Sequence, residues 1–566
     1  MSDIPKREAS LFSKIWGGLL FEAVQKASPD AWFDFFSFPK CVLLAPVRGG
    51  RRISKRKKQA DLVHERLTMW TEKRKELWEA VVARGGRRPN VVAHRESPLE
   101  KRVMKAIRMG DVRKALQLFT AAPFAPKNAE TLEKLKALHP DARFPIEPPS
   151  EQISASPYFD EKVVREALAT FSPCSAAGVF GYRPRLLQQC ARAESFYFMP
   201  SLTRAVNYFC SGEAPDFLQP FIAGGVSIAL AKPNRGVRPL CSGDAIRRLV
   251  AKCFCLGAKD EISEEFKGKN YGVGCPGGVE VVSHSLRDTL AQHKGSKMAL
   301  LKIDFKNAFN LVERDKFIKA TAARFPALER WTRWCYSHAP LLLYDHCELF
   351  SSRCGVQQGD PLGPLYFCCA LQSLVDRIAE LMPTYQKWYM DDGGIIGDTA
   401  LLMKVWEILK SDGPDLGMLL NPEKCEWSWL NPECNEPCPI ELVQLVPTHK
   451  IQMLGVPLGS DPFVVTMWSA SYFPPRRKSQ QLVEFEDTQS ALYLLRLSFR
   501  IVRANHFMRT TPLRHWEEQA KKFDATIRDA TELIIKHNLP SAAYDHPFWR
   551  SGNQKSSRSR ANCFRG

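Results

Sequence analysis

Apolar positions recur with two different periods through the middle of the chain, and this predicts a mixed α+β fold. Residues 298–303 form an apolar run of strand length that ends at Asp304. Residues 313–325 follow a helical pattern instead. Residues 386–396 place an acidic turn between two β-prone runs. We expect a hairpin there, because Asp392-Gly393 supplies the backbone freedom that a tight turn needs.

Helical patterns also dominate both ends of the chain. The segment Ser97 to Glu100 has the order of a capping box, and a charged helix is expected over residues 61–83. Between positions 495 and 503, three arginines and three apolar residues fall on separate helical faces. Prolines at 145–149 and at 474–475 predict boundaries between these terminal regions and the middle of the chain.

The composition narrows the class of protein. The 566 residues include 80 Lys and Arg against 61 Asp and Glu, a formal charge of +19. This excess favours a polyanionic partner such as nucleic acid, although an acidic protein would also fit. The 17 cysteines are scattered, which favours free thiols in a reducing, intracellular compartment. There is no signal sequence and no apolar run of about 18 residues, so neither secretion nor membrane spanning is expected.

A basic run near the N-terminus bears on localisation. Arg48 to Lys58 carries seven basic residues and no acidic one. It is typical of a flexible arm for nucleic acid or of a nuclear-import signal, and a solvated linker is the alternative. The expected localisation is therefore intracellular, with the nucleus as the compartment that this run allows. The tail over 546–566 is polar and basic, and we expect it to be disordered.

The segment Tyr389-Met390-Asp391-Asp392 is the most informative candidate for chemistry. Two carboxylates at a turn, with no basic residue between them, repel each other unless a cation is bound. A divalent metal ion is the obvious partner. Taken alone, the segment also fits a solvated surface turn.

Two further segments change that balance. An aspartate at the end of a buried strand, as at Asp304, is costly unless it is paired or metal-bound, and capping of the next helix is the alternative. Gly355 to Leu365 contains three glycines and two prolines just before an apolar helix. Such a loop-to-helix junction lets backbone approach a substrate closely.

These three segments, in this order, resemble the palm of a reverse transcriptase of the type found in retrotransposons without long terminal repeats. The resemblance extends over roughly residues 95–510. It implies an α+β right-hand polymerase with an antiparallel-sheet palm, fingers and a helical thumb, preceded by a helical N-terminal extension. The implied division is a basic helical extension over 1–150, fingers and the start of the palm over 151–300, palm over 301–475, thumb over 476–545 and tail over 546–566.

The resemblance also implies the catalytic centre. Asp304 and Asp391 would bridge two metal ions, with Asp392 beside them in a smaller role and the backbone carbonyl of Phe305 facing a metal. Mg²⁺ is expected because the ligands are hard oxygens and the substrate carries phosphates, and Mn²⁺ is the alternative. Lys424 matches a lysine near the leaving group, which is a candidate acid for pyrophosphate departure. A surface lysine is the other interpretation.

The substrate contacts follow in the same way. Phe309 matches the aromatic residue that excludes a 2′-hydroxyl, and core packing is the alternative. Gln358 and Gly359 match residues that line the incoming nucleotide and template base. Lys232 and Arg238 would contact the triphosphate, or else belong to an ordinary solvated hairpin. Arg247 and Arg248 are expected to support the template backbone.

The function that follows is RNA-directed DNA polymerisation, with an RNA template, a DNA or RNA primer and deoxynucleoside triphosphates as partners. Two alternatives stay open. One is an RNA-directed RNA polymerase, which Phe309 disfavours. The other is an inactive or truncated element-derived protein that binds nucleic acid without polymerising. Cys425, Cys434 and Cys438 give only a weak zinc pattern, and an inserted loop is the preferred interpretation.

Overall fold

The computed structural model describes residues 3–45, 55–85, 99–119, 122–149, 153–193, 196–232, 236–345, 348–472, 482–496 and 502–538. The chain divides into two compact units. The first comprises Met1–Glu96 with Ala121–Leu454, and the second comprises Ser97–Thr120 with Gly455–Gly566. The finer division into extension, fingers, palm and thumb stays a prediction.

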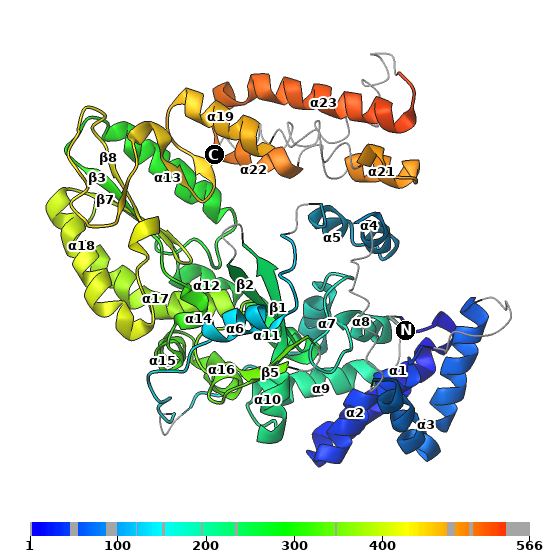
Figure 1. Cartoon of the computed structure of the whole chain (residues 1–566). Helices are drawn as coiled ribbons and strands as arrows, with labels where there is room; N and C mark the ends of the chain where they lie inside the picture. Colours follow the sequence, from blue (N-terminus) through cyan, green and yellow to red (C-terminus); the bar gives the residue numbers. More distant parts are fainter. Residues whose placement is uncertain are drawn as a thin grey trace. The chain divides into compact units, whose positions relative to one another are not determined.

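A five-stranded sheet forms the part of the first unit that carries the acidic motifs (Figure 1). Its strand order is β6-β7-β3-β8-β9. The strands are β6 (Tyr385–Tyr389), β7 (Asp392–Gly397), β3 (Ala299–Ile303), β8 (Glu426–Trp429) and β9 (Gln444–Leu445). All neighbours are antiparallel except β8 and β9, which run parallel. The predicted α+β class and antiparallel palm sheet are confirmed, with β9 as a parallel addition at one edge.

A second, four-stranded sheet lies in the same unit, with the order β2-β1-β4-β5. The strands are β1 (Gly225–Ala231), β2 (Val237–Gly243), β4 (Leu341–Tyr344) and β5 (Glu348–Ser351). The strands β1 and β2 form a long antiparallel hairpin, and β1 pairs in parallel with β4. This hairpin carries the predicted triphosphate contacts. The short strand β10 (Gln452–Met453) completes the strands of this unit.

Helices cover both sheets, because apolar side chains recur on one face of each helix. α18 packs on β3 and β7, while α13 packs on β6. The helices from the second sheet onward are α11 (Ala245–Gly257), α12 (Lys259–Glu265), α13 (Gly278–Gln292), α14 (Ala308–Leu311), α15 (Arg314–Arg324), α16 (Glu329–Tyr336), α17 (Gly363–Ala379) and α18 (Thr399–Asp412). The predicted helices over 313–325 and 366–378 correspond to α15 and α17.

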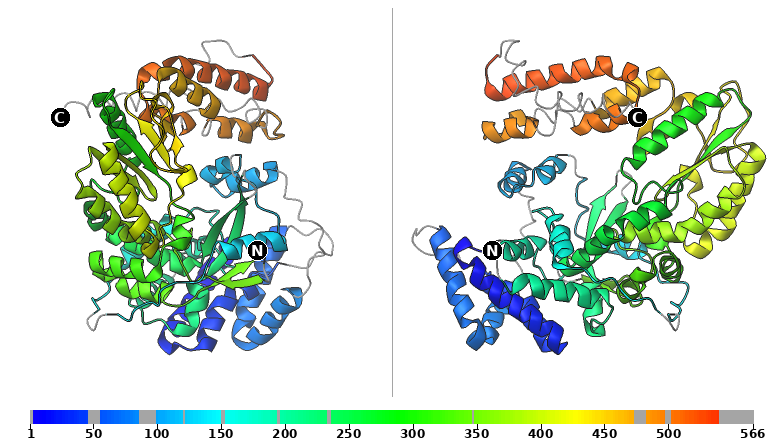
Figure 2. Two further views of the ribbon diagram at one scale, coloured as in Figure 1. Left: turned by 60° about the vertical axis from the view of Figure 1, so that its left-hand side comes forward. Right: turned by 180° about the vertical axis from the view of Figure 1, so that it is seen from behind.

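The N-terminal part of the first unit is helical throughout its described residues. α1 (Ala9–Lys26), α2 (Pro29–Val42) and α3 (Lys55–Gly85) lie side by side in both views of Figure 2, and α1 also packs on α9 (Phe198–Cys210). The other helices before the second sheet are α6 (Ala129–Ala137), α7 (Glu161–Ala169), α8 (Pro184–Arg192) and α10 (Gln219–Ile222). The aromatic residues of α2 are mostly buried, so this segment is a packed cluster.

The second unit contains helices and the short strand β11 (Val456–Pro457). Its helices are α4 (Leu99–Arg108), α5 (Val112–Gln117), α19 (Asp461–Tyr472), α21 (Thr488–Leu494), α22 (Val502–Thr510) and α23 (Glu517–Ile535). Most of the predicted two-faced helix around 495–503, most of the basic run from Arg48, and the 546–566 tail lie outside the described residues. Within the described ranges, no helix combines the length and apolar character needed to cross a bilayer.

Candidate active site

The register of the palm sheet brings the predicted carboxylates together. Ile303, the last residue of β3, pairs with Gly393 of β7, and Tyr389 pairs with Asp392 across the neighbouring hairpin. Asp304 therefore leaves β3 beside the turn that carries Asp391. The predicted convergence of positions 304 and 391, which are far apart in sequence, is observed.

These carboxylates lie close enough to influence one another electrostatically. Burial, followed by the nearby charge of Asp304, raises the pKa of Asp391 above its usual value, although a backbone hydrogen bond opposes the shift. Burial and then the charge of Asp391 raise the pKa of Asp392 to about 6, against the opposing effect of Lys302. Like charges held close in a partly buried site leave a negative potential that a cation would relieve.

Asp304 is held by the segment that follows β7 and α18. The Asn421 side-chain amide donates to Asp304 Oδ1 (2.9 Å), and the Asn421 backbone N–H donates to the Asp304 carbonyl (2.9 Å). The Asp304 N–H donates to the Cys425 sulfur (3.4 Å). Burial raises the pKa of the Cys425 thiol to about 11, so it stays protonated at neutral pH and supports Asp304 as a neutral group.

The ring and the backbone of Phe305 make different contacts, and the predicted role toward a metal ion concerns only the backbone carbonyl. The ring is buried and stacks on Trp388, with ring centroids 6.3 Å apart. Phe305 bridges to Leu420 through hydrogen bonds that its two neighbours make, from Lys306 N to Leu419 O (2.7 Å) and from Asn421 N to Asp304 O. The Phe305 carbonyl is outside that pair of bonds, which leaves it eligible to face a metal ion.

The hairpin turn differs from the sequence prediction. The two residues between β6 and β7 are Met390 and Asp391, because Tyr389 pairs with Asp392. Gly393 lies within β7 and not at the turn. A Cβ atom there would approach the Trp388 ring to 2.4 Å, so this glycine makes room for the tryptophan. The positive φ that the turn needs is at Met390 (54°).

Two of the predicted basic side chains, Lys424 and Lys232, lie near Asp304. Lys424 Nζ lies 3.9 Å from Asp304 Oδ1, and its side chain is 66% exposed. Burial, then the charges of Lys424 and Arg238, lower the pKa of Lys232, while Asp304 raises it. Residues from the β1–β2 hairpin, from the end of β3 and from the segment after α18 thus share one electrostatic environment.

Phe309 lies on the short helix α14, directly after the strand that ends in Asp304. Its ring is half-buried and stacks on Phe367, with centroids 5.0 Å apart and planes at 16°. Its carbonyl accepts a hydrogen bond from Val356 N (2.7 Å), in the loop that carries Gln358. Both interpretations of Phe309 keep support, since the ring packs on one side and remains partly exposed.

Gln358 and Gly359 are held against β2. The Cys241 N–H donates to the Gln358 carbonyl (2.8 Å). Gly359 has φ +133°, and a Cβ atom there would lie 2.1 Å from the Cys241 carbonyl oxygen. Only glycine fits this approach. The Gln358 side chain is half-buried and Gly359 is exposed, so both remain available to a ligand.

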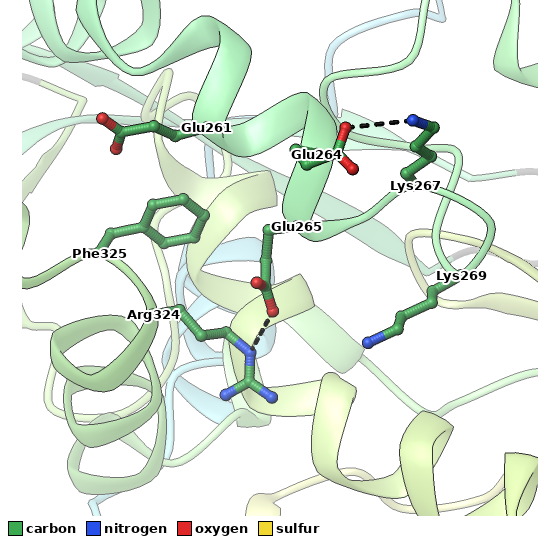
Figure 3. A pocket seen from close by; sticks show the side chains of 7 residues that line it. All are labelled: Glu261, Glu264, Glu265, Lys267, Lys269, Arg324 and Phe325. Carbon is green, nitrogen blue, oxygen red and sulfur yellow. Dashed lines mark hydrogen bonds and ion pairs between the residues drawn. The ribbon is translucent and has the colours of Figure 1, made fainter.

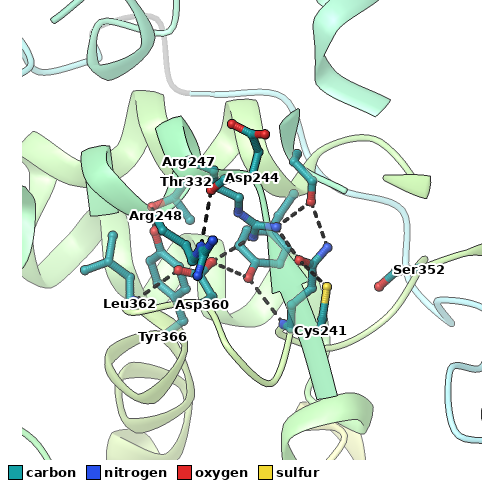
Figure 4. Close-up of polar contacts among 12 residues, drawn as sticks. Cys241, Asp244, Arg247, Arg248, Thr332, Ser352, Asp360, Leu362 and Tyr366 are labelled. Atoms are coloured by element: carbon teal, nitrogen blue, oxygen red, sulfur yellow. Dashed lines mark hydrogen bonds and ion pairs between the residues drawn. The ribbon is translucent and has the colours of Figure 1, made fainter. Parts of the chain in front are cut away.

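A buried polar network around Arg247 holds this loop in place (Figure 4). The network also shows that the prediction for Arg247 is wrong. Arg247 is 1% exposed and cannot reach a template; its Nη2 donates to Asp360 Oδ2 (2.7 Å). It also donates to the Gln357 side chain and to the Ala223 carbonyl. Asp360 further accepts from Tyr336 Oη (2.7 Å) and from Leu362 N (3.0 Å). Sequence reasoning missed this role because Asp360 is distant along the chain.

The predicted metal-binding side chains offer oxygen donors, which are the type of donor that a hard divalent cation prefers. Asp304, Asp391 and Asp392 supply carboxylate oxygens, and burial, with the charge of a neighbouring carboxylate after it, raises the pKa values of the latter two. Among the described residues, no group of three or more His, Cys, Asp or Glu side chains is gathered closely enough to enclose a metal ion. Mg²⁺ in phosphate chemistry is commonly held by only one or two carboxylates, with substrate phosphates and water completing its shell.

A surface pocket elsewhere in the first unit has a different character (Figure 3). It has a volume of about 480 Å³ and is lined by residues of α12, the loop after it, and the end of α15. Its charges pair with each other: Glu264 with Lys267 (3.2 Å) and Arg324 with Glu265 (3.0 Å). None of the predicted site residues lines this pocket.

Residues 231–458 match the family described as "Reverse transcriptase (RNA-dependent DNA polymerase)". This part of the chain, which contains every predicted site residue, therefore carries a reverse transcriptase domain, a domain of the nucleotidyltransferase class. The chain is also similar to the retrotransposable element SLACS 132 kDa protein of Trypanosoma brucei gambiense, with 24% identity over 204 residues. The resemblance predicted from the motifs is confirmed. The similarity covers 35% of this chain but only 17% of that protein's length.

Among solved structures, apo telomerase from Candida tropicalis covers 56% of this chain and 64% of its own, with 13% identity and a TM-score of 0.33. A Candida albicans telomerase in complex with a fragment of telomeric RNA covers 57% of this chain and 62% of its own, with 12% identity and a TM-score of 0.31.

Proposed function

We propose that this chain extends a primer 3′-end with deoxynucleotides on an RNA template, using two divalent metal ions held at Asp304 and Asp391. The observation that carries the proposal is the register of β3 against β7, which sets Asp304 beside the Met390–Asp391 turn inside a reverse transcriptase domain. Mg²⁺ is the proposed ion and Mn²⁺ the substitute. Bound metal would activate the primer hydroxyl and stabilise the leaving pyrophosphate.

The remaining chemistry falls to the chain's own residues. Asp304 and Asp391 bind cations, and the fixed backbone on either side keeps both carboxylates oriented before substrate arrives. Lys232 and Arg238 offer donors for triphosphate oxygens, the arginine through its forked guanidinium. Gln358 and Gly359 present an amide and a bare backbone to the base pair being formed. The charge of Asp304 acts on Lys232, and so does the charge of Arg238, which supports the placing of Lys232 near both.

Deoxynucleotide preference is assigned to Phe309. Its ring follows Asp304 by five positions and is braced by Phe367, so it would sit rigidly against the sugar. A ring held rigidly against the sugar would leave no space for a 2′-hydroxyl. This supports a DNA polymerase over an RNA polymerase.

Primer extension on an RNA template tests the proposal. The full chain is given deoxynucleotides with Mg²⁺ or Mn²⁺, and wild type is compared with Asp391→Asn. We expect the variant to lose on the order of 10³-fold or more in rate, since it removes charge from the metal site. Asp398→Asn is the matched control, because Asp398 only caps α18 by accepting from Leu401 N (2.8 Å).

Each outcome has a distinct meaning. The control should keep wild-type activity and nearly the wild-type unfolding free energy, because asparagine caps a helix about as well as aspartate. Equal extension by wild type and Asp391→Asn would reject the proposed site. No extension by wild type, with RNA still bound, would favour a protein that binds nucleic acid without polymerising.

A further inference from the structure

A loop from outside the palm sheet continues it beyond its edge strand. Trp388 N donates to the Lys269 carbonyl (3.2 Å), and Tyr271 N donates to the Trp388 carbonyl (2.8 Å). These bonds form a parallel bridge between Asn270 and Trp388. Because β6 ends the strand order on this side, residues 269–272 cover an edge that would otherwise be open. We call residues 269–272 the edge segment.

The Asn270 side chain reaches from the edge segment to the catalytic turn. Its Oδ1 accepts from Met390 N (3.0 Å), and its Nδ2 donates to the Met390 carbonyl (3.2 Å). The same Oδ1 also accepts from Gly272 N (3.0 Å). Asn270 is 1% exposed, so water competes little for these bonds. One amide thus satisfies both backbone groups of the residue that precedes Asp391.

Met390 needs such support because its backbone is strained. Its φ of 54° lies in the left-handed region, where a residue with a side chain pays a penalty that glycine avoids. Hairpins with two-residue turns normally place glycine, asparagine or aspartate at this position. A strained conformation persists only where the surroundings hold it, and such positions cluster at functional sites.

Gly272 makes the approach possible. A Cβ atom on Gly272 would lie 2.5 Å from Met390 Cγ and 2.6 Å from Met390 N. The edge segment can therefore lie this close to the turn only with glycine at that position. Two residues of the edge segment make the contact with Met390 possible. Gly272 leaves space for the close approach, and Asn270 supplies the hydrogen bonds.

We infer that Asn270 is a positioning residue for the active site, holding Met390 in its left-handed conformation so that the Asp391 carboxylate faces Asp304 before metal and substrate bind. The inference rests on the proposed function for its catalytic meaning. Asn270 does not touch the reacting atoms. It acts through one peptide unit, as the hydrogen-bond partners around metal ligands commonly do, and their loss typically costs 10–100-fold in metal affinity or activity.

The chain contains a matched control for this arrangement. Asn207 of α9 accepts from Phe159 N (2.8 Å) and donates to the Phe159 carbonyl (2.8 Å), which is the same two-bond pattern on another backbone. Neither residue belongs to the predicted active site. Asn207→Ala therefore removes equivalent bonds with a structural role alone.

The experiment compares wild type, Asn270→Ala and Asn207→Ala as full chains. Mn²⁺ binding to the free protein is followed by electron paramagnetic resonance, and primer extension gives kcat and the KM for deoxynucleotide. We expect Asn270→Ala to bind Mn²⁺ about 10-fold more weakly and to lose about 10–100-fold in kcat, with KM within about twofold. Asn207→Ala should match wild type in all three quantities, whatever its thermal stability.

Gly272→Ala keeps the experiment decisive if Asn270→Ala does not fold, because the added methyl group crowds Met390 directly while the Asn270 side chain is kept. The same loss of Mn²⁺ affinity and kcat is expected. Wild-type Mn²⁺ binding and kcat in the folded variant would overturn the inference, and so would equal losses in Asn270→Ala and Asn207→Ala. If wild type polymerises nothing but Mn²⁺ binding still separates the two asparagine variants, the proposed function fails and the positioning role stands.

Discussion

Two polar regions of the first unit handle buried charge in opposite ways. Around Arg247, the carboxylate of Asp360 finds a guanidinium, a phenol and a backbone N–H, all supplied by the chain itself. Around Asp391, burial first and nearby carboxylates after it raise the pKa values of Asp391 and Asp392, although Lys302 opposes the shift at Asp392. One region pairs its buried carboxylate with a buried arginine, whereas the other holds neighbouring carboxylates that a bound cation would stabilise further.

The difference separates scaffold from site. The Arg247 network bonds to residues within and next to the Gln357–Gly359 loop, and its role is to keep the loop backbone rigid. The Asp391 region retains charge that folding alone does not compensate, and an enzyme tolerates this only where the charge has a use. Breaking the first region should therefore cost stability, while neutralising the second should cost activity and spare the fold.

Arg247→Met should produce the largest loss of stability. It leaves Asp360 as a buried charge without its cation, and breaking a buried pair in this way costs about 3–5 kcal/mol. Denaturant unfolding measures the change. Arg248→Met is the control, since the hydrogen bonds of Arg248 in the described part of the chain go to the carbonyl oxygens of Ala176 and Asp244 and not to a carboxylate, so its loss should cost less.

A double variant separates charge from packing in the same network. Arg247→Met with Asp360→Leu removes both charges, so a substantial part of the lost stability should return. If Arg247→Met is no more harmful than Arg248→Met, the network is not the scaffold described here.

Phe309 links the two regions and gives the next effect. Its carbonyl accepts from Val356 N in the loop above the Arg247 network, while its ring follows Asp304. Phe309→Val should raise ribonucleotide use relative to deoxynucleotide use by about 10–100-fold, because it opens space beside the sugar. Competition between the two nucleotides in primer extension measures this ratio. Phe367→Leu, which removes only the stacking partner, should shift it far less; unchanged selectivity in Phe309→Val would assign the ring to core packing.

The unbalanced charge at Asp392 should be visible in the pH dependence of stability without metal. Its pKa is raised to about 6 in the folded protein from 3.8, so the stability it contributes is fully present below about pH 4 and is lost as the pH rises through about 6. Between pH 5 and pH 8 this amounts to about 1 kcal/mol. Asp392→Asn should lose that much less unfolding free energy than wild type over this range.

Two comparisons check the assignment. Asp398→Asn should keep the wild-type pH dependence, because Asp398 lies outside the carboxylate group. Mg²⁺ should flatten the wild-type curve by stabilising the ionised form. Identical pH curves for wild type and Asp392→Asn would show that its charge is already balanced.

The sequence predicted those parts of the site that depend on local pattern. The apolar run over 298–303 predicted β3, and the end of this run placed Asp304 directly after the strand. The β-prone runs around Asp391 predicted the hairpin β6–β7. An apolar run and an alternating run each determine their own element, and antiparallel pairing then determines which ends meet.

The remaining features depend on partners far along the chain. The turn was predicted at Asp392-Gly393, but Asn270 bonds Met390 from 120 positions away and makes a left-handed methionine tolerable. Arg247 was expected at a template because arginines at a helix start suit phosphate, yet its partner Asp360 lies 113 positions on. A single sequence shows that such residues are polar without showing which partner each one finds.

Lys424 offers the smallest and most discriminating test of the carboxylate region. Its Nζ is 3.9 Å from Asp304 and the side chain is largely exposed, so as a charge alone it should contribute little. Lys424→Met should then reduce kcat by only about 2–5-fold, and Lys424→Arg should restore it. A general acid behaves differently, because arginine does not release its proton at neutral pH and both variants would lose about 10²-fold or more. Pre-steady-state incorporation rates, measured across pH for both variants, distinguish a lysine that only neutralises Asp304 from one that protonates the leaving pyrophosphate.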